Sequence, residues 1–255
     1  MKLVFGKANA KLKGLESQFG KVVTFSVLSG HTCPYAKECL SKAVIQDQGK
    51  RRIEDGADTK FRCFSASQEV QYDGVYNSRH NNGVLIELAA KSINKAVAAI
   101  LDNIPKNTKV VRIHVGGDFK TQAYFDAWVE AAKSRRDVLF YAYTKSLPFW
   151  VKRLDRLRRI PNLVLTASRG GHKDSLIDKH NLRETVVVYS EAEAEYLGLE
   201  IDHDDSHACD PTKRSEDFAL LIHGTQPKGS DSAKKLQTLK AEGWHGYGKK
   251  GREKK

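Results

Sequence analysis

Four cysteines are the residues of this chain most able to hold a metal: Cys33, Cys39, Cys63 and Cys209. The first three fall within one short stretch, and the fourth lies far downstream. Thiolates are preferred ligands of zinc and of iron–sulfur clusters. Three clustered thiols and a distant one make a metal site if the fold returns the distant thiol to the others.

Two other interpretations of the cysteines stay open, namely two disulfides and four unrelated buried thiols. The N-terminus lacks the long apolar stretch of a signal peptide, so we expect a cytoplasmic protein. Structural disulfides are rare in the reducing cytoplasm, which favours a shared metal site.

The spacing of the thiols favours a cluster over a single ion. Four-cysteine zinc sites usually contain two close CxxC pairs, whereas at least five residues separate any two cysteines here. A cubane cluster tolerates wider spacing because it is larger than one ion. The expected cofactor is therefore a [4Fe–4S] cluster, with zinc as the alternative.

The charge of the chain predicts a polyanionic partner. The formal net charge is +12, and between residues 228 and 255 nine Lys or Arg residues face three acidic ones. Such clustering favours binding to nucleic acid, DNA or RNA, although a merely soluble basic protein would share the composition. No apolar run approaches the length of about 18 residues that a membrane span requires, so no membrane partner is expected.

Apolar strand-like runs alternate with helix-like runs along most of the chain. Helices are expected over 83–103, 121–133, 148–159, 174–180, 191–197 and 232–240. Strands are expected over 22–28, 59–62, 110–115, 138–143, 163–166, 185–189, 198–202 and 218–222. This alternation predicts an α/β, TIM-barrel-like (βα) repeat fold, regular or irregular, with an open doubly wound sheet as the rival. A single domain over 1–229 would carry the four-cysteine site, followed by a basic tail over 230–255.

Polar residues follow most of the predicted strands. In parallel α/β folds the carboxyl ends of the strands meet on one face and carry the functional groups. His114, Asp118 and His223 would form a polar site there, although a histidine in an apolar strand is more often a core residue. Contacts with nucleic acid are predicted for Lys145, Trp150, Lys152, Arg153, Arg156, Arg169, His172, Lys173 and Lys228.

The distant cysteine links the metal site to the fold. Only a returning chain, as in a closed barrel, would bring Cys209 to the first three thiols. Radical S-adenosylmethionine enzymes also join a TIM-like barrel to a cubane, but they usually present CxxxCxxC in one loop and leave one iron open. This chain has no such triplet, and a fourth thiolate would leave no iron free.

Five motifs are distinctive: HTCP at 31–34, FRCF at 61–64, RIHVGGDF at 112–119, FYAYTK at 140–145 and TASRGG at 166–171. Together they resemble a phage-encoded family, the "gene product eighty-eight" domain, over roughly residues 20–230. The resemblance implies a viral protein with an iron–sulfur site, a TIM-barrel-like fold and nucleic-acid binding. It places the family's four-cysteine pattern on Cys33, Cys39, Cys63 and Cys209, and it brings no catalytic residues.

Three functions compete on these grounds. The leading expectation is a viral iron–sulfur protein that binds nucleic acid through a basic face in the host cytoplasm, without catalysis. The first alternative is an enzyme, either one that modifies nucleic acid or one that resembles radical S-adenosylmethionine enzymes. The second alternative is a zinc-stapled interaction module.

Overall fold

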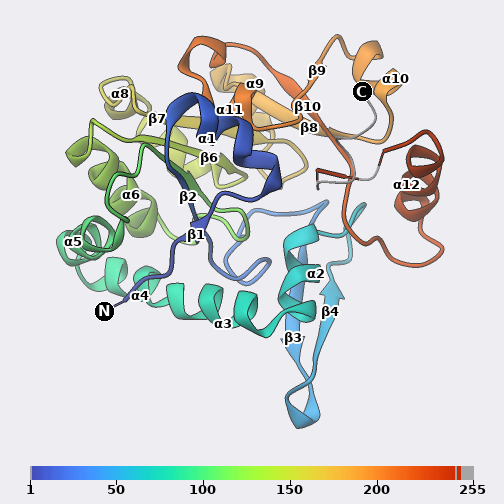
Figure 1. Ribbon diagram of the computed structural model, residues 1–255, viewed down its shortest axis with the longest axis horizontal. Coiled ribbons are helices and arrows are strands. Elements are labelled where there is room, and N and C mark those ends of the chain that lie inside the picture. Colours follow the sequence, from blue (N-terminus) through green and yellow to red (C-terminus); the bar gives the residue numbers. More distant parts are fainter. Residues whose placement is uncertain (1, 245, 248–255) are drawn as a thin grey trace.

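One mixed sheet organises the protein, shown in a computed structural model that describes residues 2–244 and 246–247 (Figure 1). Its eight strands have the order β1-β2-β5-β6-β7-β8-β10-β9. The β1–β2 pair is antiparallel and every other neighbouring pair is parallel. The strands are β1 (Gly6–Lys7), β2 (Val22–Phe25), β5 (Val110–Ile113), β6 (Leu139–Thr144), β7 (Leu163–Ser168), β8 (Glu184–Val188), β9 (Glu200–Ile201) and β10 (Phe218–Leu221).

The sheet corrects the expectation of a TIM-like barrel. From β2 to β10 the strands follow one another in chain order, as barrel strands do, but no closed barrel is found in the described part of the chain. The two-residue strands β1 and β9 form the edges instead. The order also does not reverse in the middle, as it does in a doubly wound sheet. The parallel strands therefore still present their carboxyl ends along one edge.

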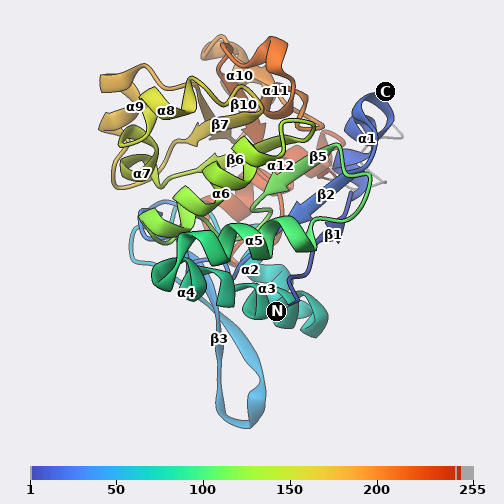
Figure 2. The same ribbon diagram turned by 90° about the vertical axis from the view of Figure 1, so that its left-hand side faces the viewer.

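The helices supply the crossovers and the outer layer. They are α1 (Lys13–Phe19), α2 (Phe64–Gln71), α3 (Asp73–Asn82), α4 (Val84–Lys91), α5 (Ile93–Asn103), α6 (Gln122–Ser134), α7 (Leu147–Val151), α8 (Leu154–Leu157), α9 (Ser175–His180), α10 (Glu191–Tyr196), α11 (Ser206–Cys209) and α12 (Asp231–Ala241). The main apolar core lies between the sheet and the layer of α4, α5 and α6 (Figure 2). Trp128 of α6 contacts Phe25 of β2 edge-on, with ring centroids 5.1 Å apart.

Two predicted helices are interrupted. The expected helix over 83–103 divides at Ser92, which has an extended backbone and accepts a hydrogen bond from the Lys95 amide through its hydroxyl, so it caps the start of α5. The expected helix over 148–159 consists of the short helices α7 and α8. Periodicity located both segments, and a local capping interaction decided the break in the first.

A β-hairpin replaces the strand that was expected over 59–62. The strands β3 (Ser41–Ile45) and β4 (Arg51–Asp55) pair with each other and project from the body (Figures 1 and 2). The turn between them is the 3-10 helix Asp47–Gly49. Residues 59–62 have no regular structure, because their backbone groups bond to the loop before the hairpin instead of to a strand.

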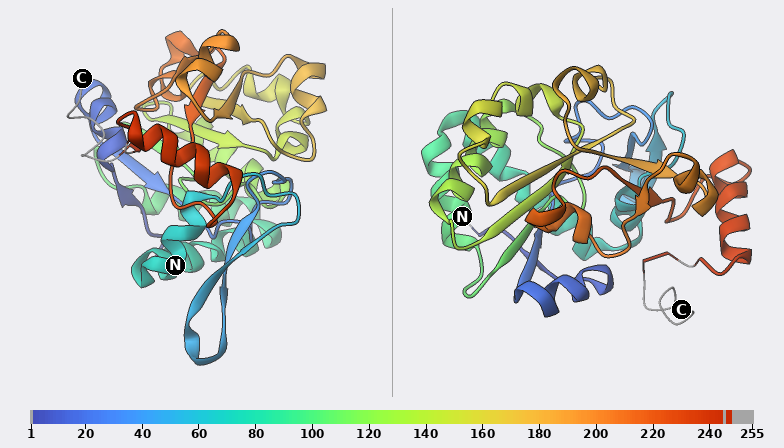
Figure 3. Two further views of the ribbon diagram at one scale, coloured as in Figure 1. Left: turned by 90° about the vertical axis from the view of Figure 1, so that its right-hand side faces the viewer. Right: turned by 90° about the horizontal axis from the view of Figure 1, so that it is seen from above.

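The described part of the predicted tail packs on the body. The helix expected over 232–240 is present as α12, and Leu236 and Leu239 join an apolar cluster with Val188 and Leu221 (Figure 3). The indole N–H of Trp244 donates to the carbonyl of Ile222 at 3.0 Å. Residues 245 and 248–255 of the predicted tail lie outside the described residues.

Candidate functional site

A cavity of about 440 Å³ opens at the carboxyl edge of the sheet. Its wall contains residues that follow β2, β5, β6, β7 and β10, together with part of the 3-10 helix Ala10–Leu12 and with Tyr247. This position is where parallel α/β folds gather their functional groups. Its size is that of an ordinary small-molecule pocket.

Three of the four cysteines line this cavity: Cys33, Cys39 and Cys63. The hairpin explains how the last two meet across 23 intervening residues. Its strands return the chain to its starting point, where the Gly56 amide donates to the carbonyl of Leu40 at 2.7 Å. The amides of Lys60 and Phe61 then donate to the carbonyl of Glu38, at 2.8 and 3.1 Å. Most of the intervening sequence is thus looped out, and a short connection remains.

Cys209 lies in a different place. It ends α11 and is fully buried in an apolar cluster with Tyr141, Val164 and Phe218. It is absent from the cavity wall. The closure that would have brought Cys209 to the other thiols is also absent, because the sheet is open. The structure therefore brings three of the four predicted ligands together.

The charges around the thiols reflect this arrangement. Burial raises the pKa of Cys33, and the nearby Asp118, Cys63 and Cys39 raise it further. Burial and the neighbouring Cys39 raise the pKa of Cys63 to about 11. Three thiolates packed together repel one another. Ionisation of all three thiols is therefore favourable only when a cation lies among the sulfurs.

Lys145 is the cation whose charge acts on Cys39. Burial raises the pKa of Cys39, and the charge of Lys145 opposes that rise. The Lys145 ammonium donates to the carbonyls of Ser168 at 2.7 Å and of Arg169 at 2.6 Å. Lys145 is buried and lines the cavity, so it belongs to the cavity wall rather than to the outer basic surface.

A glycine loop after β5 forms another side of the cavity. Gly117 has φ 83°, and a Cβ there would lie 2.5 Å from a methyl carbon of Val27 and 2.6 Å from the hydroxyl of Thr32. Only glycine therefore allows this loop to pack against the segment that leads to Cys33. Next in the chain, Asp118 accepts hydrogen bonds from the Thr144 hydroxyl at 2.6 Å and from the Lys145 amide at 2.8 Å.

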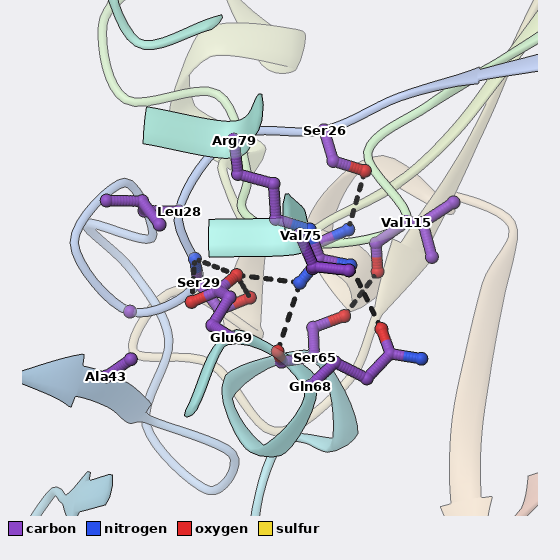
Figure 4. Close-up of polar contacts among 12 residues, drawn as sticks. Ser26, Leu28, Ser29, Ala43, Ser65, Gln68, Glu69, Val75, Arg79 and Val115 are labelled. Atoms are coloured by element: carbon purple, nitrogen blue, oxygen red, sulfur yellow. Dashed lines mark hydrogen bonds and ion pairs between the residues drawn. The ribbon is translucent and has the colours of Figure 1, made fainter. Parts of the chain in front are cut away.

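A buried ion pair holds the loop of Cys33 against the helix that follows Cys63. Glu69 of α2 accepts hydrogen bonds from the amide and the hydroxyl of Ser29, at 3.0 and 2.9 Å (Figure 4). Arg79 of α3 donates to the Glu69 carboxylate at 2.8 Å and to the Ser65 carbonyl at 3.0 Å. No pattern in the sequence predicted this network, because its members are far apart in the chain and share no motif.

The predicted polar residues His114, Asp118 and His223 all line the cavity. His114 has φ 67°, a strained value for a residue with a side chain, and its Nε2 lies 2.9 Å from the Tyr124 hydroxyl. Burial lowers the pKa of His114 to about 3, and its Nδ1 is buried without a partner among the described residues. His114 is thus a neutral imidazole with one ring nitrogen to spare.

A second charged group surrounds Asp205, and no motif in the sequence predicted it. The buried carboxylate of Asp205 receives Lys11 Nζ at 2.6 Å, Arg112 Nη1 at 2.5 Å and the hydroxyl of Tyr141 at 2.8 Å. The hydroxyl of Tyr143 donates to it at 3.2 Å. Lys11, Arg112 and Tyr143 line the cavity. A charged residue within the apolar run 110–115 was the one signal that could have predicted this group.

The residues predicted to bind nucleic acid occupy three kinds of environment. Trp150 and Lys145 are buried. Arg153 pairs with Asp126, Arg156 with Glu130, and Arg169 with Asp178 and Glu184. The side chains that remain exposed are those of Lys152, His172, Lys173 and Lys228.

The fold and the cavity define an α/β protein with a cysteine-lined pocket at the carboxyl edge of an open, mostly parallel sheet. The chain matches the Gene product 88 family over residues 2–240, and it belongs to that family. No curated protein and no solved structure matches it.

Within residues 2–244 and 246–247, no set of three His, Cys, Asp or Glu side chains has the geometry to hold a single metal ion. No helix in the same part of the chain is both long and apolar enough to cross a membrane.

Proposed function

We propose that this protein is an iron–sulfur enzyme of the radical S-adenosylmethionine type, acting in the cytoplasm of a host cell. The observation that carries the proposal is the placement of the cysteines: Cys33, Cys39 and Cys63 share a cavity wall, and Cys209 is buried elsewhere. Three thiolates can hold a cubane and leave one iron without a protein ligand. The objection that a fourth thiolate would block that iron no longer applies.

The surroundings of the thiols fit a cluster better than a single ion. A cubane holds its ligands further apart than one zinc ion does, and the thiols lack the geometry of a single-ion site within the described chain. The Gly30 amide donates to the sulfur of Cys33 at 3.3 Å, a type of contact that tunes cluster potential. A cluster held by these three thiols, once reduced by an external electron donor, would supply the electron that divides S-adenosylmethionine into methionine and a 5′-deoxyadenosyl radical, and this radical would take a hydrogen atom from the substrate.

The residues of the chain have definable tasks in this proposal. Gly117 lets the loop after β5 approach the Cys33 segment, and Asp118 is fixed by Thr144 and by the Lys145 amide. Lys145 supplies a positive charge beside Cys39. The spacing of the cysteines differs from the usual CxxxCxxC, and the looped-out hairpin accounts for much of the difference.

The proposal is tested by anaerobic reconstitution with iron and sulfide. We expect a broad brown absorption band, about four irons per chain, and a change in the electron paramagnetic resonance spectrum of the reduced protein when S-adenosylmethionine is added. Cys33→Ala, Cys39→Ala and Cys63→Ala should each lose most of the iron, whereas Cys209→Ala should keep it. Loss of iron in Cys209→Ala, or a colourless zinc protein, would refute the proposal.

Nucleic-acid binding is the second candidate, and one group of exposed cations favours it. Lys152 directly follows α7. Phe149 of this helix contacts Tyr35, with ring centroids 5.6 Å apart. The His172 amide donates to the carbonyl of Tyr35 at 2.9 Å, so Lys152, His172 and Lys173 come from neighbouring segments. These cations would neutralise phosphates on an approaching strand.

Filter binding with DNA and RNA at two salt concentrations tests this candidate. Retention should fall steeply as salt rises from about 50 to 200 mM, since phosphate contacts release counterions. The double substitution Lys152→Ala and Lys173→Ala should reduce binding to either polymer, with Lys95→Ala, in α5, as a control. Binding that does not change with the salt concentration, or the absence of binding, would exclude this candidate function.

A further inference from the structure

Two cations in the cavity wall share one carboxylate. Lys11 and Arg112 both contact Asp205, and each is only 9% exposed. Burial opposes ionisation of Asp205, but the charges of these two cations and the hydrogen bond from Lys11 lower its pKa to about 2. This carboxylate is therefore ionised at neutral pH. The cavity wall thus places two cations beside one ionised carboxylate.

The other titratable groups near this wall are Asp202, His223 and Tyr247. The nearby Asp202 is buried, and burial raises its pKa, whereas the charge of Lys11 opposes that rise. Burial, together with the charges of Lys11 and Arg112, lowers the pKa of His223 to about 4, so its imidazole is neutral. Burial also raises the pKa of Tyr247, whose phenol stays neutral.

Arg112 has donors beyond those that Asp205 accepts. A guanidinium carries five N–H donors in a planar fork. Its Nη1 donates to Asp205, and its Nε is buried without a partner in the described part of the chain. An unpartnered buried donor costs free energy, and a ligand in the adjoining cavity is one way to satisfy the guanidinium.

This wall is distinct from the thiol wall of the same cavity. The strongest charge effects on Cys33 come from Asp118 and the other two thiols, and Lys145 acts on Cys39. The strongest charge effects on His223 come instead from Lys11 and Arg112. The cavity therefore has thiols on one side and cations on the other.

We propose that the Lys11–Arg112 wall binds an anionic group, a phosphate or a carboxylate, of the molecule that reacts in the cavity. The inference rests on the proposed function for its reaction, but the binding site rests on the two cations in the cavity wall and on the Nε of Arg112, which is unpartnered within the described residues. Arginine pairs well with both groups because its fork matches two oxygens at once. The cavity volume fits a small anionic molecule or one nucleotide-sized part of a larger one.

Calorimetric titration of the full-length protein with inorganic phosphate, and separately with acetate, tests the inference at fixed ionic strength. We expect saturable binding of at least one of them, and the tighter one identifies the group. Lys11→Met should weaken binding at least tenfold, while the exposed control Lys95→Met should leave it unchanged. Absence of saturable binding, or equal affinity in Lys11→Met, would overturn the inference.

A second variant covers the case in which Lys11→Met fails to fold. Arg112→Lys keeps the positive charge beside Asp205 and removes the Nε donor, so it should fold and still bind the anion about tenfold more weakly. Unchanged affinity in this variant counts against the inference.

The same titrations, run before and after reconstitution with iron and sulfide, separate the two proposals. Anion binding without cluster formation would refute the proposed function and support the anion site. Cluster formation without anion binding would leave the proposed function standing and refute the anion site.

Discussion

Two fully buried carboxylates, Glu69 and Asp205, show how similar ion pairs can serve different ends. Glu69 has one cation, Arg79, and fills its other acceptor positions with the amide and hydroxyl of Ser29. Asp205 has two cations and two tyrosine hydroxyls. The first network sets one cation against its carboxylate, and the second sets two cations against one carboxylate.

The position of each network fits its charge. Neither Glu69 nor Arg79 lines the cavity, and their hydrogen bonds join the Cys33 loop to α2. Lys11 and Arg112 do line the cavity. A buried pair away from the cavity can fix loops without a ligand, whereas two cations in the cavity wall are placed to attract an anion.

The largest expected effect is the loss of either carboxylate. Glu69→Ala and Asp205→Ala should each lower the free energy of unfolding by about 3–5 kcal/mol, because each removes the carboxylate that buried cations contact. Urea unfolding measures the effect. The exposed Glu195→Ala serves as a control within about 0.5 kcal/mol of the parent chain. A cost below about 1 kcal/mol would show that the network in question contributes little.

Phosphate should separate the two networks. In Asp205→Asn an anion can replace the missing charge, so phosphate at ten times its dissociation constant should restore about 1.4 kcal/mol of unfolding free energy. With phosphate, Glu69→Gln should gain no more unfolding free energy than the parent chain, because the cation of Glu69, Arg79, does not line the cavity. Equal recovery in both variants would remove the distinction drawn between them.

The tyrosine hydroxyls should matter in proportion to their contacts with Asp205. Tyr141→Phe removes a donor at 2.8 Å and should cost about 1.5–3 kcal/mol, as expected for a hydrogen bond to a charged group. Tyr143→Phe removes a longer contact of 3.2 Å and should cost about 1 kcal/mol. Chemical unfolding of the two variants ranks them, and a reversed order would contradict the geometry.

The smallest expected effect is a dependence on pH. The pKa of Asp205 is about 2 in the folded chain and near 3.9 in an unfolded one. Its ionised form therefore stabilises the fold above pH 4, and that contribution disappears as the pH falls toward 2. The difference in unfolding free energy between the parent chain and Asp205→Asn should narrow by about 1 kcal/mol between pH 6 and pH 3. A constant difference would place the pKa of Asp205 close to its ordinary value.

The sequence predicted much of the position of the site, but it did not predict which residues the site contains. Strand ends at His114 and Lys145 predicted a polar edge, and alternation predicted the parallel strands that create it. The grouping of Cys63 with Cys39 depended on the hairpin Ser41–Asp55, which the strand pattern did not reveal. The placement of Cys209 depended on whether the sheet closed, which short edge strands decided.

The sequence by itself determined the alternation of strands and helices, the polar carboxyl edge and the family to which the chain belongs. Those features depend on local periodicity and on motifs, which are encoded in neighbouring residues. The tertiary structure decided which thiols share a wall and which cations share Asp205. Burial and contact between residues far apart in the chain create those properties, and no local pattern records them.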